Sequence, residues 1–350
     1  MNRFILKILL VLLPALVILV SVNYFGDAAN LFSKNFEMKV AEGILSGSHV
    51  TNVSDYNERL LQRFIVTNSK LCPEVLVIGS SRTMEINSTY FTGKTFFNNS
   101  VSGASIEDLI AVCELYDKKG CHPKNMIIGL DPWTLNKNNG QTRWKSLTPE
   151  YNIFRRELNL DTLAQDENVN IYSQLISPSY FNGSLKALLH PKKPILTKQS
   201  SNDAMTRVND GSVCYGVDHR NLTKAQIETK AKEFGTVGNI YSVEKFDELS
   251  PDVKMMLEHL TAKLKSQNVS VTFFLSPYNP LVYHIFETNK QYSQIMQSEA
   301  YYKSLAEKNN IRIIGSFDPK ICEMDESFFY DGMHANGKGI AKILSGYQPK

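Results

Sequence analysis

The chain has 350 residues, of which 43% are hydrophobic, so it can bury one sizeable core or two small ones. Its formal net charge is only +3, and no large basic face favours nucleic acid as a partner. The apolar fraction also excludes a chain that is disordered throughout.

The N-terminus begins with basic residues followed by an apolar run. Arg3 and Lys7 precede residues 8–22, which carry no charge. Together with the apolar residues before Lys7, this run approaches the roughly 20 residues that a helix needs to cross a bilayer. Positive charges before the run predict a cytoplasmic N-terminus and a body in the periplasm or at the cell surface. We expect a single membrane anchor over residues 1–24; the alternative is a signal peptide cleaved near Gly26-Asp27-Ala28.

Apolar, β-branched runs alternate with helical patterns over much of the remaining chain. Residues 25–70 are expected to form a linker and a packing helix, at residues 54–67, before the first strand. Strands that read as near-continuous apolar runs and are separated by helices predict an α/β fold, with a parallel sheet covered on both faces. The expected strands are residues 75–78, 95–98, 125–130, 269–275 and 311–314, and the expected helices between and after them are residues 105–119, 291–308 and 337–344.

One segment interrupts this alternation. Residues 134–242 are rich in Asn, Ser, Lys and Tyr, and a compact domain has no need of a structureless loop that long. We interpret the segment as an inserted, partly helical cap. Its charge clusters, Arg155-Arg156 and Asp218-His219-Arg220, are either solvated surface or part of a groove for a polar or anionic polymer.

The five cysteines match no zinc-binding spacing, and their odd number leaves at least one thiol unpaired. Cys113 lies among apolar residues, where it either fills the core or pairs with Cys121 in an oxidising compartment. We expect neither a metal nor a cofactor.

Asp331 and His334 stand three residues apart in one short segment, Asp331-Gly332-Met333-His334. A carboxylate that hydrogen-bonds one ring nitrogen of a histidine fixes its tautomer and leaves the other nitrogen as a general base. Such a pair needs a nucleophile. Ser81, in Gly79-Ser80-Ser81-Arg82, directly follows the first apolar strand, where open α/β sheets place their chemistry.

The motifs Gly79-Ser80-Ser81, Asn98-Asn99-Ser100-Val101-Ser102-Gly103, Gly129-Leu130-Asp131 and Asp331-Gly332-Met333-His334, in this order, resemble the SGNH (GDSL-like) hydrolase superfamily. The resemblance covers roughly residues 70–135 and 265–346. It implies a flavodoxin-like three-layer domain over residues 71–346 that contains the insertion. It also implies that Ser81 is the nucleophile, His334 the general base and Asp331 its orienting carboxylate.

The resemblance further implies an oxyanion hole made by backbone N–H groups near Ser81 and at Ser100 to Gly103. Asp131 stands where the family usually has an Asn donor, and an ionised carboxylate cannot donate a hydrogen bond. Asn98 or Asn99 is expected to take that part. The alternative for Asp131 is a cap or salt bridge at the strand end.

Arg82 also has two interpretations. It either forms a surface contact or salt bridge, or it meets a substrate phosphate or carboxylate, for which a guanidinium is well shaped. Trp133 and Trp144 likewise either pack in the core and cap or stack on sugar rings.

Gly79-Ser80-Ser81-Arg82 with the later Gly129-Leu130-Asp131-Pro132 is similar to a membrane-anchored bacterial branch of the superfamily. That branch includes proteins for teichoic-acid D-alanylation and for acetylation of alginate and other surface polysaccharides. The resemblance implies serine-dependent transfer of an acyl group, an acetyl in the first instance, to a cell-surface polysaccharide through an acyl-Ser81 intermediate. A transferase with one span needs a multi-pass membrane acyltransferase to present the acyl donor. The alternatives are an acetylesterase on the same substrates and a catalytically silent glycan-binding scaffold.

Overall fold

The computed structural model describes residues 2–28, 31–32, 36–53, 56–164, 171–189, 193–237 and 240–350. At its centre lies a five-stranded sheet in which all neighbouring strands run parallel, in the order β3-β2-β4-β8-β9. The chain is therefore an α/β protein, as predicted. The five strands are β2 (Val75–Ile78), β3 (Phe96–Asn98), β4 (Asn125–Gly129), β8 (Ser270–Leu275) and β9 (Arg312–Gly315).

The strand order places a switch point in the sheet. Numbered along the chain, these strands lie in the order 2-1-3-4-5, so the connections leave β2 in one direction and β4 in the other. Open sheets bind ligands outside the carboxyl ends of the strands at such a point. The ends of β2 and β4 are therefore where chemistry is expected.

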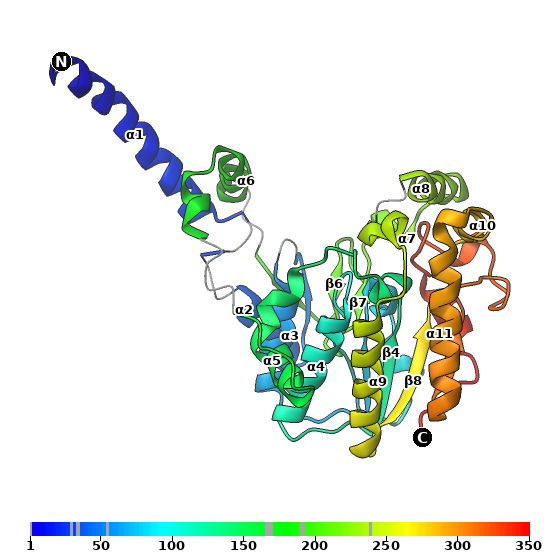
Figure 1. The fold of residues 1–350 in the computed structure, drawn as a ribbon. Coiled ribbons are helices and arrows are strands. Elements are labelled where there is room, and N and C mark those ends of the chain that lie inside the picture. The colour runs from blue at the N-terminus through cyan, green and yellow to red at the C-terminus, as the bar shows by residue number, and fades with distance from the viewer. Residues whose placement is uncertain are drawn as a thin grey trace.

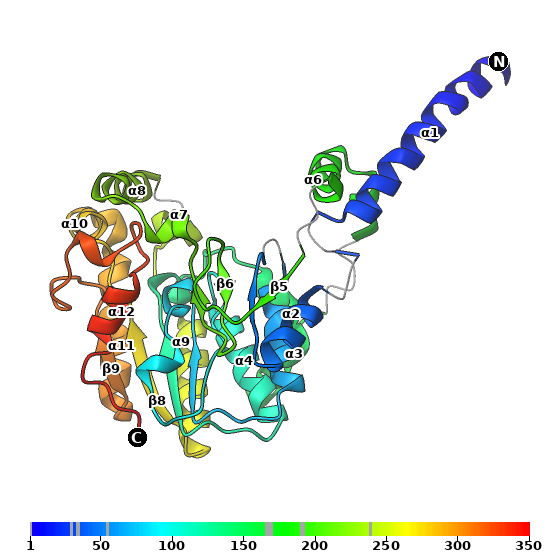
Figure 2. The same ribbon diagram turned by 180° about the vertical axis from the view of Figure 1, so that it is seen from behind.

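Alternate residues of the strands pack into two cores on opposite faces of the sheet. Leu76 and Ile78 join the larger core, which includes α4 (Ile106–Lys118), α9 (Pro251–Ser266) and α11 (Ser293–Asn309). Val75 and Val77 join a second core that includes α12 (Gly337–Ile343). Figure 1 shows α9 and α11 in front of the sheet, and Figure 2, seen from behind, shows α12 on the other side.

Local signals in the sequence set the ends of several helices. Ser105 begins α4 with a capping box, in which its backbone N–H donates to Asp108 Oδ2 at 3.0 Å. The helix expected from Ser54 is α3 (Glu58–Asn68), because the Asn57 side chain caps the N–H groups of Arg59 and Leu60. Ser54 itself lies outside the described residues.

The insertion contains β-strands as well as the helices that were expected of it. It contributes three strands to a second, antiparallel sheet that the sequence did not predict, with the order β5-β1-β6-β7. Its first helix, α5, packs against α4 of the main body. The strands are β1 (His49–Thr51), β5 (Ile195–Thr197), β6 (Thr206–Arg207) and β7 (Val213–Cys214), and the remaining helices are α2 (Phe36–Leu45), α5 (Thr148–Glu157), α6 (Pro178–Leu189), α7 (Val217–Arg220), α8 (Lys224–Val237) and α10 (Pro280–Thr288).

At the N-terminus, α1 (Asn2–Gly26) projects from the body, and α6 lies beside its C-terminal end (Figure 1). Within the part of the chain that the structure describes, no helix has both the length and the apolarity needed to cross a membrane. The anchor over residues 1–24 stays a prediction.

The disulfide joins Cys72 to Cys121, with the sulfurs 2.06 Å apart. The alternative pairing of Cys113 with Cys121 is wrong. Cys113 is buried in the core from α4, where its thiol lies 3.8 Å from Met126 Sδ, whereas Cys72 and Cys121 lie in loops at the same end of the sheet. Burial raises the pKa of the Cys113 thiol, which favours its neutral form.

Candidate active site

Ser81, His334 and Asp331 meet beyond the carboxyl end of β2. Ser81 Oγ lies 2.9 Å from His334 Nε2, and His334 Nδ1 lies 2.8 Å from Asp331 Oδ2. Each of the three is only partly buried. A serine hydroxyl, an imidazole and a carboxylate in this chain of contacts form the arrangement that activates a serine nucleophile.

Asp331 is held in its ionised form. Its burial raises the pKa, but the nearby His334 ring and three hydrogen bonds outweigh that effect and hold the pKa of this carboxyl well below its usual range. Besides the ring, the donors are the backbone N–H groups of Met333 and His334, both 2.8 Å from Oδ1. Both oxygens of the carboxylate are thus engaged, and its orientation toward the ring is fixed.

Two glycines let the turn that carries Ser81 pack against the strand ends. This turn, called the nucleophile turn below, is the short 3₁₀ helix η1 (Ser81–Thr83), and its Thr83 side chain lies between Gly79 and Gly129. A Cβ atom on Gly79 would come 2.5 Å from Thr83 Oγ1, and one on Gly129 would come 2.5 Å from Thr83 Cγ2. Both approaches are too close for any side chain, so these glycines fix the position of the turn.

The Asn98 side chain and the Ser100 N–H group form hydrogen bonds inside the protein, next to this turn, and neither is free to donate to an oxyanion. Asn98 Nδ2 donates to Thr83 O and Ile86 O, both at 2.8 Å, and Asn98 Oδ1 accepts from the Ser100 N–H at 2.9 Å. Both residues are fully buried. The expectation that Asn98 or the Ser100 N–H donates to the oxyanion is therefore corrected, because each already has a partner inside the protein.

The alternative donor Asn99 is engaged as well. Its Nδ2 donates to Gln62 Oε1, and its Oδ1 accepts from Tyr116 OH at 2.6 Å. Gly103 adopts a φ of +54°, and its carbonyl accepts from Gln141. Within the described part of the chain, no backbone carbonyl accepts a hydrogen bond from the N–H group of Ser81 or of Gly103. We therefore keep these two N–H groups as candidate donors to a ligand.

Arg82 and Asp131 form a salt bridge with each other, which confirms the salt-bridge interpretation given for each and corrects their assignment as substrate contacts. Arg82 Nη1 lies 2.8 Å from Asp131 Oδ1, and both side chains are buried. The guanidinium also donates to the carbonyls of Met333 at 3.0 Å and Pro277 at 3.0 Å, and it stacks 4.0 Å from the centroid of the Tyr278 ring. Arg82 therefore connects the ends of β2, β4 and β8 to the loop that carries His334.

A second carboxyl group, which sequence reasoning missed, lies close to the triad. Glu85 Oε1 accepts a hydrogen bond from Tyr330 OH at 3.0 Å, while its Oε2 is buried without a partner. Burial raises the pKa of Glu85 to about 7, although the Tyr330 hydrogen bond and the charges of His334 and Arg220 act in the opposite direction. In the sequence, only its position four residues after Ser81 indicates that Glu85 lies near the site.

The insertion reaches the nucleophile turn. The Val213 N–H donates to Met84 O at 2.8 Å, and Asp210 accepts from the backbone N–H of Ser88 at 2.8 Å. Tyr215 packs edge-on against Tyr330, with ring centroids 5.7 Å apart. The insertion thus forms one wall beside the triad.

The remaining candidates of the insertion and of the strand ends have structural contacts. Trp133 is buried and donates to Ala104 O, and Trp144 packs partly buried against the main core. Arg155 donates to Asp161 O, and Arg220 donates to the carbonyls of Tyr215 and Asn202.

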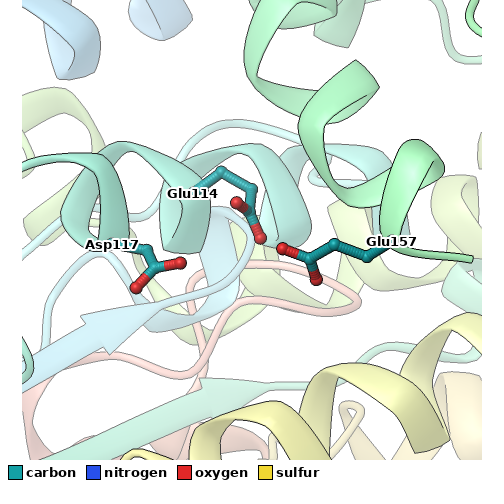
Figure 3. A group of neighbouring side chains, drawn as sticks. All are labelled: Glu114, Asp117 and Glu157. Atoms are coloured by element: carbon teal, nitrogen blue, oxygen red, sulfur yellow. The ribbon is translucent and has the colours of Figure 1, made fainter.

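One group of carboxylates has the spacing of a metal site. Glu114 and Asp117 on α4 point toward Glu157 on α5 (Figure 3). Lys263 Nζ lies among them, 2.6 Å from Glu114, 3.1 Å from Asp117 and 2.7 Å from Glu157. Because the Lys263 ammonium already contacts all three carboxylates, we interpret the cluster as an ion-pair network that joins α4, α5 and α9.

No family model and no curated protein matches the chain. Among solved structures, one that matches is LAE5, an α/β hydrolase enzyme from the metagenome of Lake Arreo in Spain. The two chains are 11% identical, the match covers 77% of this chain and 90% of that chain, and the TM-score is 0.31. At this TM-score the likeness is too distant to bear on the fold or the activity of this chain.

Proposed function

We propose that the chain is a serine-dependent acyl-transfer enzyme of the SGNH type that works through an acyl-Ser81 intermediate. The observation that carries this proposal is the continuous contact from Ser81 Oγ to His334 Nε2 at 2.9 Å and from His334 Nδ1 to Asp331 Oδ2 at 2.8 Å. The strand order of the sheet and the position of Ser81 after β2 agree with the flavodoxin-like architecture of that superfamily.

The reaction follows from the geometry. His334 Nε2 takes the proton of Ser81 Oγ as this oxygen attacks the acyl carbon of an ester donor. The bond from the acyl carbon to the donor oxygen then breaks, and the departing oxygen takes the proton from His334. A hydroxyl group next gives its proton to His334 and attacks the acyl-Ser81 ester. Ser81 Oγ leaves, and the proton returns to it.

The oxyanion that forms at each step needs donors. The backbone N–H groups of Ser81 and Gly103 are our candidates, because no backbone carbonyl of the described residues accepts a hydrogen bond from either of them. Removal of one oxyanion donor from a hydrolase typically costs about 10²–10³ in rate. Asp131 stands where the family has an Asn donor, and it pairs with Arg82 instead of facing this site. Because one donor is therefore missing, we expect poor hydrolysis of simple esters such as p-nitrophenyl acetate.

The acceptor in this proposal is a cell-surface polysaccharide and the acyl group is an acetyl, as the sequence resemblance implies. The body lies outside the cytoplasm, anchored by the N-terminal helix, and a multi-pass membrane acyltransferase presents the donor. The Cys72–Cys121 disulfide supports an oxidising compartment, where such bonds persist.

The test compares the ester content of the surface polysaccharide in cells that carry the wild type, Ser81→Ala or a deletion of the gene. Loss of esters in both altered strains supports a transferase, and a gain of esters in both supports an acetylesterase. If only the deletion changes the surface and Ser81→Ala behaves as the wild type, the enzyme proposal fails and the chain is a scaffold.

A further inference from the structure

The C-terminal end of α1 is built into a unit with part of the insertion. Asn23, which is fully buried, donates through Nδ2 to the carbonyls of Gln174 and Leu175, both at 2.9 Å. Tyr180 OH donates to Asp27 Oδ1 at 3.0 Å. These contacts join α1 to η5 (Ile171–Ile176) and to α6, which lies across the end of α1 in both views (Figures 1 and 2).

The backbones of α1 and α6 also approach closely. A Cβ atom on Gly26 would lie 2.1 Å from Ser184 O, so only glycine fits at this position of α1. Ser184 is fully buried by this approach. Residues 172–189 therefore pack directly against α1, although about 150 residues separate the two segments in the chain.

This unit carries most of the exposed large apolar side chains of the described residues. Tyr172 is 67% exposed, Ile176 59% and Leu189 66%. On α6 the apolar residues recur at helical spacing, which gives the helix one apolar face. The exposed set continues along α1 and onto β5, and comprises Leu10, Leu12, Leu13, Leu16, Val17, Ile18, Tyr24, Phe25, Tyr172, Ile176, Leu185, Leu188, Leu189, Ile195 and Leu196.

The charges in the sequence of these segments have one sign. Residues 168–202 contain four lysines, Lys186, Lys192, Lys193 and Lys198, and no Asp or Glu. Residues 1–26 likewise contain Arg3 and Lys7 and no acidic residue, and Asp27, which follows them, is buried and accepts the hydrogen bond from Tyr180. An apolar helix face accompanied by exposed lysines, such as Lys186 and Lys193, complements a bilayer that carries anionic lipids. A second copy of the same surface would instead bring like charges together.

We propose that η5 and α6 form a lipid-binding element, which lies in the interface of an anionic bilayer beside α1. The element holds the body at the membrane surface through Tyr172, Ile176, Leu188 and Leu189, with the lysines near the headgroups. This inference goes beyond the acyl-transfer chemistry and does not depend on it.

The experiment uses the full chain reconstituted in vesicles of phosphatidylcholine with phosphatidylglycerol. Leu189→Trp places a fluorophore on α6, and Ile321→Trp is the matched control, because Ile321 is 63% exposed but lies on the body next to α12. We expect that lipids brominated on their acyl chains quench the fluorescence added by Leu189→Trp at least twofold, and that the emission of this indole is shifted to the blue. The fluorescence added by the control substitution is expected to be unchanged by these lipids.

A second pair of samples tests the charges. Lys186→Glu combined with Lys193→Glu, in the Leu189→Trp background, should reduce the quenching in the anionic vesicles. Equal quenching of Leu189→Trp and Ile321→Trp, or no quenching of either, would overturn the proposal. A blue shift of Leu189→Trp that depends on protein concentration and not on brominated lipid would show instead that the surface joins two copies of the chain, which also overturns it.

Discussion

At the scale of single residues, the contact between Asp331 and His334 Nδ1 leaves Nε2 as the ring nitrogen that lies next to Ser81. Oδ2 lies 2.8 Å from Nδ1, so the ionised carboxylate keeps a proton on Nδ1 and leaves the Nε2 lone pair toward Ser81. The depressed pKa of Asp331 means that it stays ionised down to acidic pH. The roles of the two ring nitrogens are thus fixed by one neighbour.

Asp331→Asn should preserve the fold and impair the chemistry. The Asn oxygen can still accept from the N–H groups of Met333 and His334, but its amide would donate to Nδ1 and favour the wrong tautomer. In a serine protease triad the equivalent change costs about 10⁴ in rate. We expect a loss of about 10³–10⁴ in the rate of Ser81 acylation, measured with a fluorophosphonate, at an unchanged circular dichroism spectrum. Asp325→Asn, at an exposed helix cap, is the control, and equal rates for the two variants would contradict the role of Asp331.

Glu85 makes stability depend on pH. Its folded-state pKa, about 7, lies above the ordinary value near 4.5, so the folded protein holds a proton that the unfolded chain has already lost. The wild type should therefore lose stability as the pH rises through this window. Glu85→Gln removes the titration and keeps an acceptor for Tyr330. We expect that its unfolding free energy, relative to the wild type, rises by about 2–3 kcal/mol between pH 5 and pH 8.

Urea unfolding of the two proteins at both pH values measures this difference. Parallel changes of the wild type and Glu85→Gln would show that Glu85 is ionised in the folded protein. Such a result would place the buried Oε2 atom in contact with solvent or with a cation.

At the scale of elements, the buried pair of Arg82 and Asp131 connects the strand ends to the loop that carries His334. Because both side chains are buried, removal of one partner leaves a charge without compensation, which typically costs about 3–5 kcal/mol. Asp131→Asn should lower the unfolding free energy by that amount. It should also slow the acylation of Ser81, since Arg82 contacts Met333 next to His334.

The matched control is Glu248→Gln, which removes the partner of Lys137 from an exposed pair. Exposed ion pairs contribute little to the free energy of unfolding, so the stability of this variant should stay close to that of the wild type. If Asp131→Asn is as stable as Glu248→Gln, the pair does not support the site in the way that we infer.

The elements also show what the sequence could and could not predict. The five strands of the main sheet were predicted because strands buried on both faces read as apolar runs, such as Val75–Ile78. The antiparallel sheet was missed because β6 and β7 are only two residues long, which is too short to show the alternation of apolar and polar residues that marks a strand. The Cys72–Cys121 pair was missed because spacing in the chain does not show which loops meet.

The same distinction holds at the site. Ser81, Asp331 and His334 were predicted because each lies in a short motif whose chemistry is readable locally. The partners of Arg82, Asp131 and Asn98 depend on contacts between distant segments, and the sequence could assign them only by resemblance. Glu85 was missed because its buried position follows from Tyr330, 245 residues later.

At the scale of the whole molecule, the insertion joins two separate regions. One part of it packs beside the nucleophile turn, through Val213 and Asp210, and another part packs on α1, through Gln174 and Tyr180. The catalytic end of the sheet and the apolar unit of α1 and α6 are therefore linked by one continuous segment.

The proposed acyl transfer depends on Ser81 being a nucleophile that His334 activates. Covalent labelling of the purified full chain with a fluorophosphonate, followed by mass spectrometry of the labelled peptide, tests this role. We expect one label, on Ser81, which is lost in Ser81→Ala and slowed strongly in His334→Ala, but which persists in the matched neighbour Ser80→Ala. A folded wild-type chain that takes no label, or a label that remains in Ser81→Ala, would show that Ser81 is not the nucleophile.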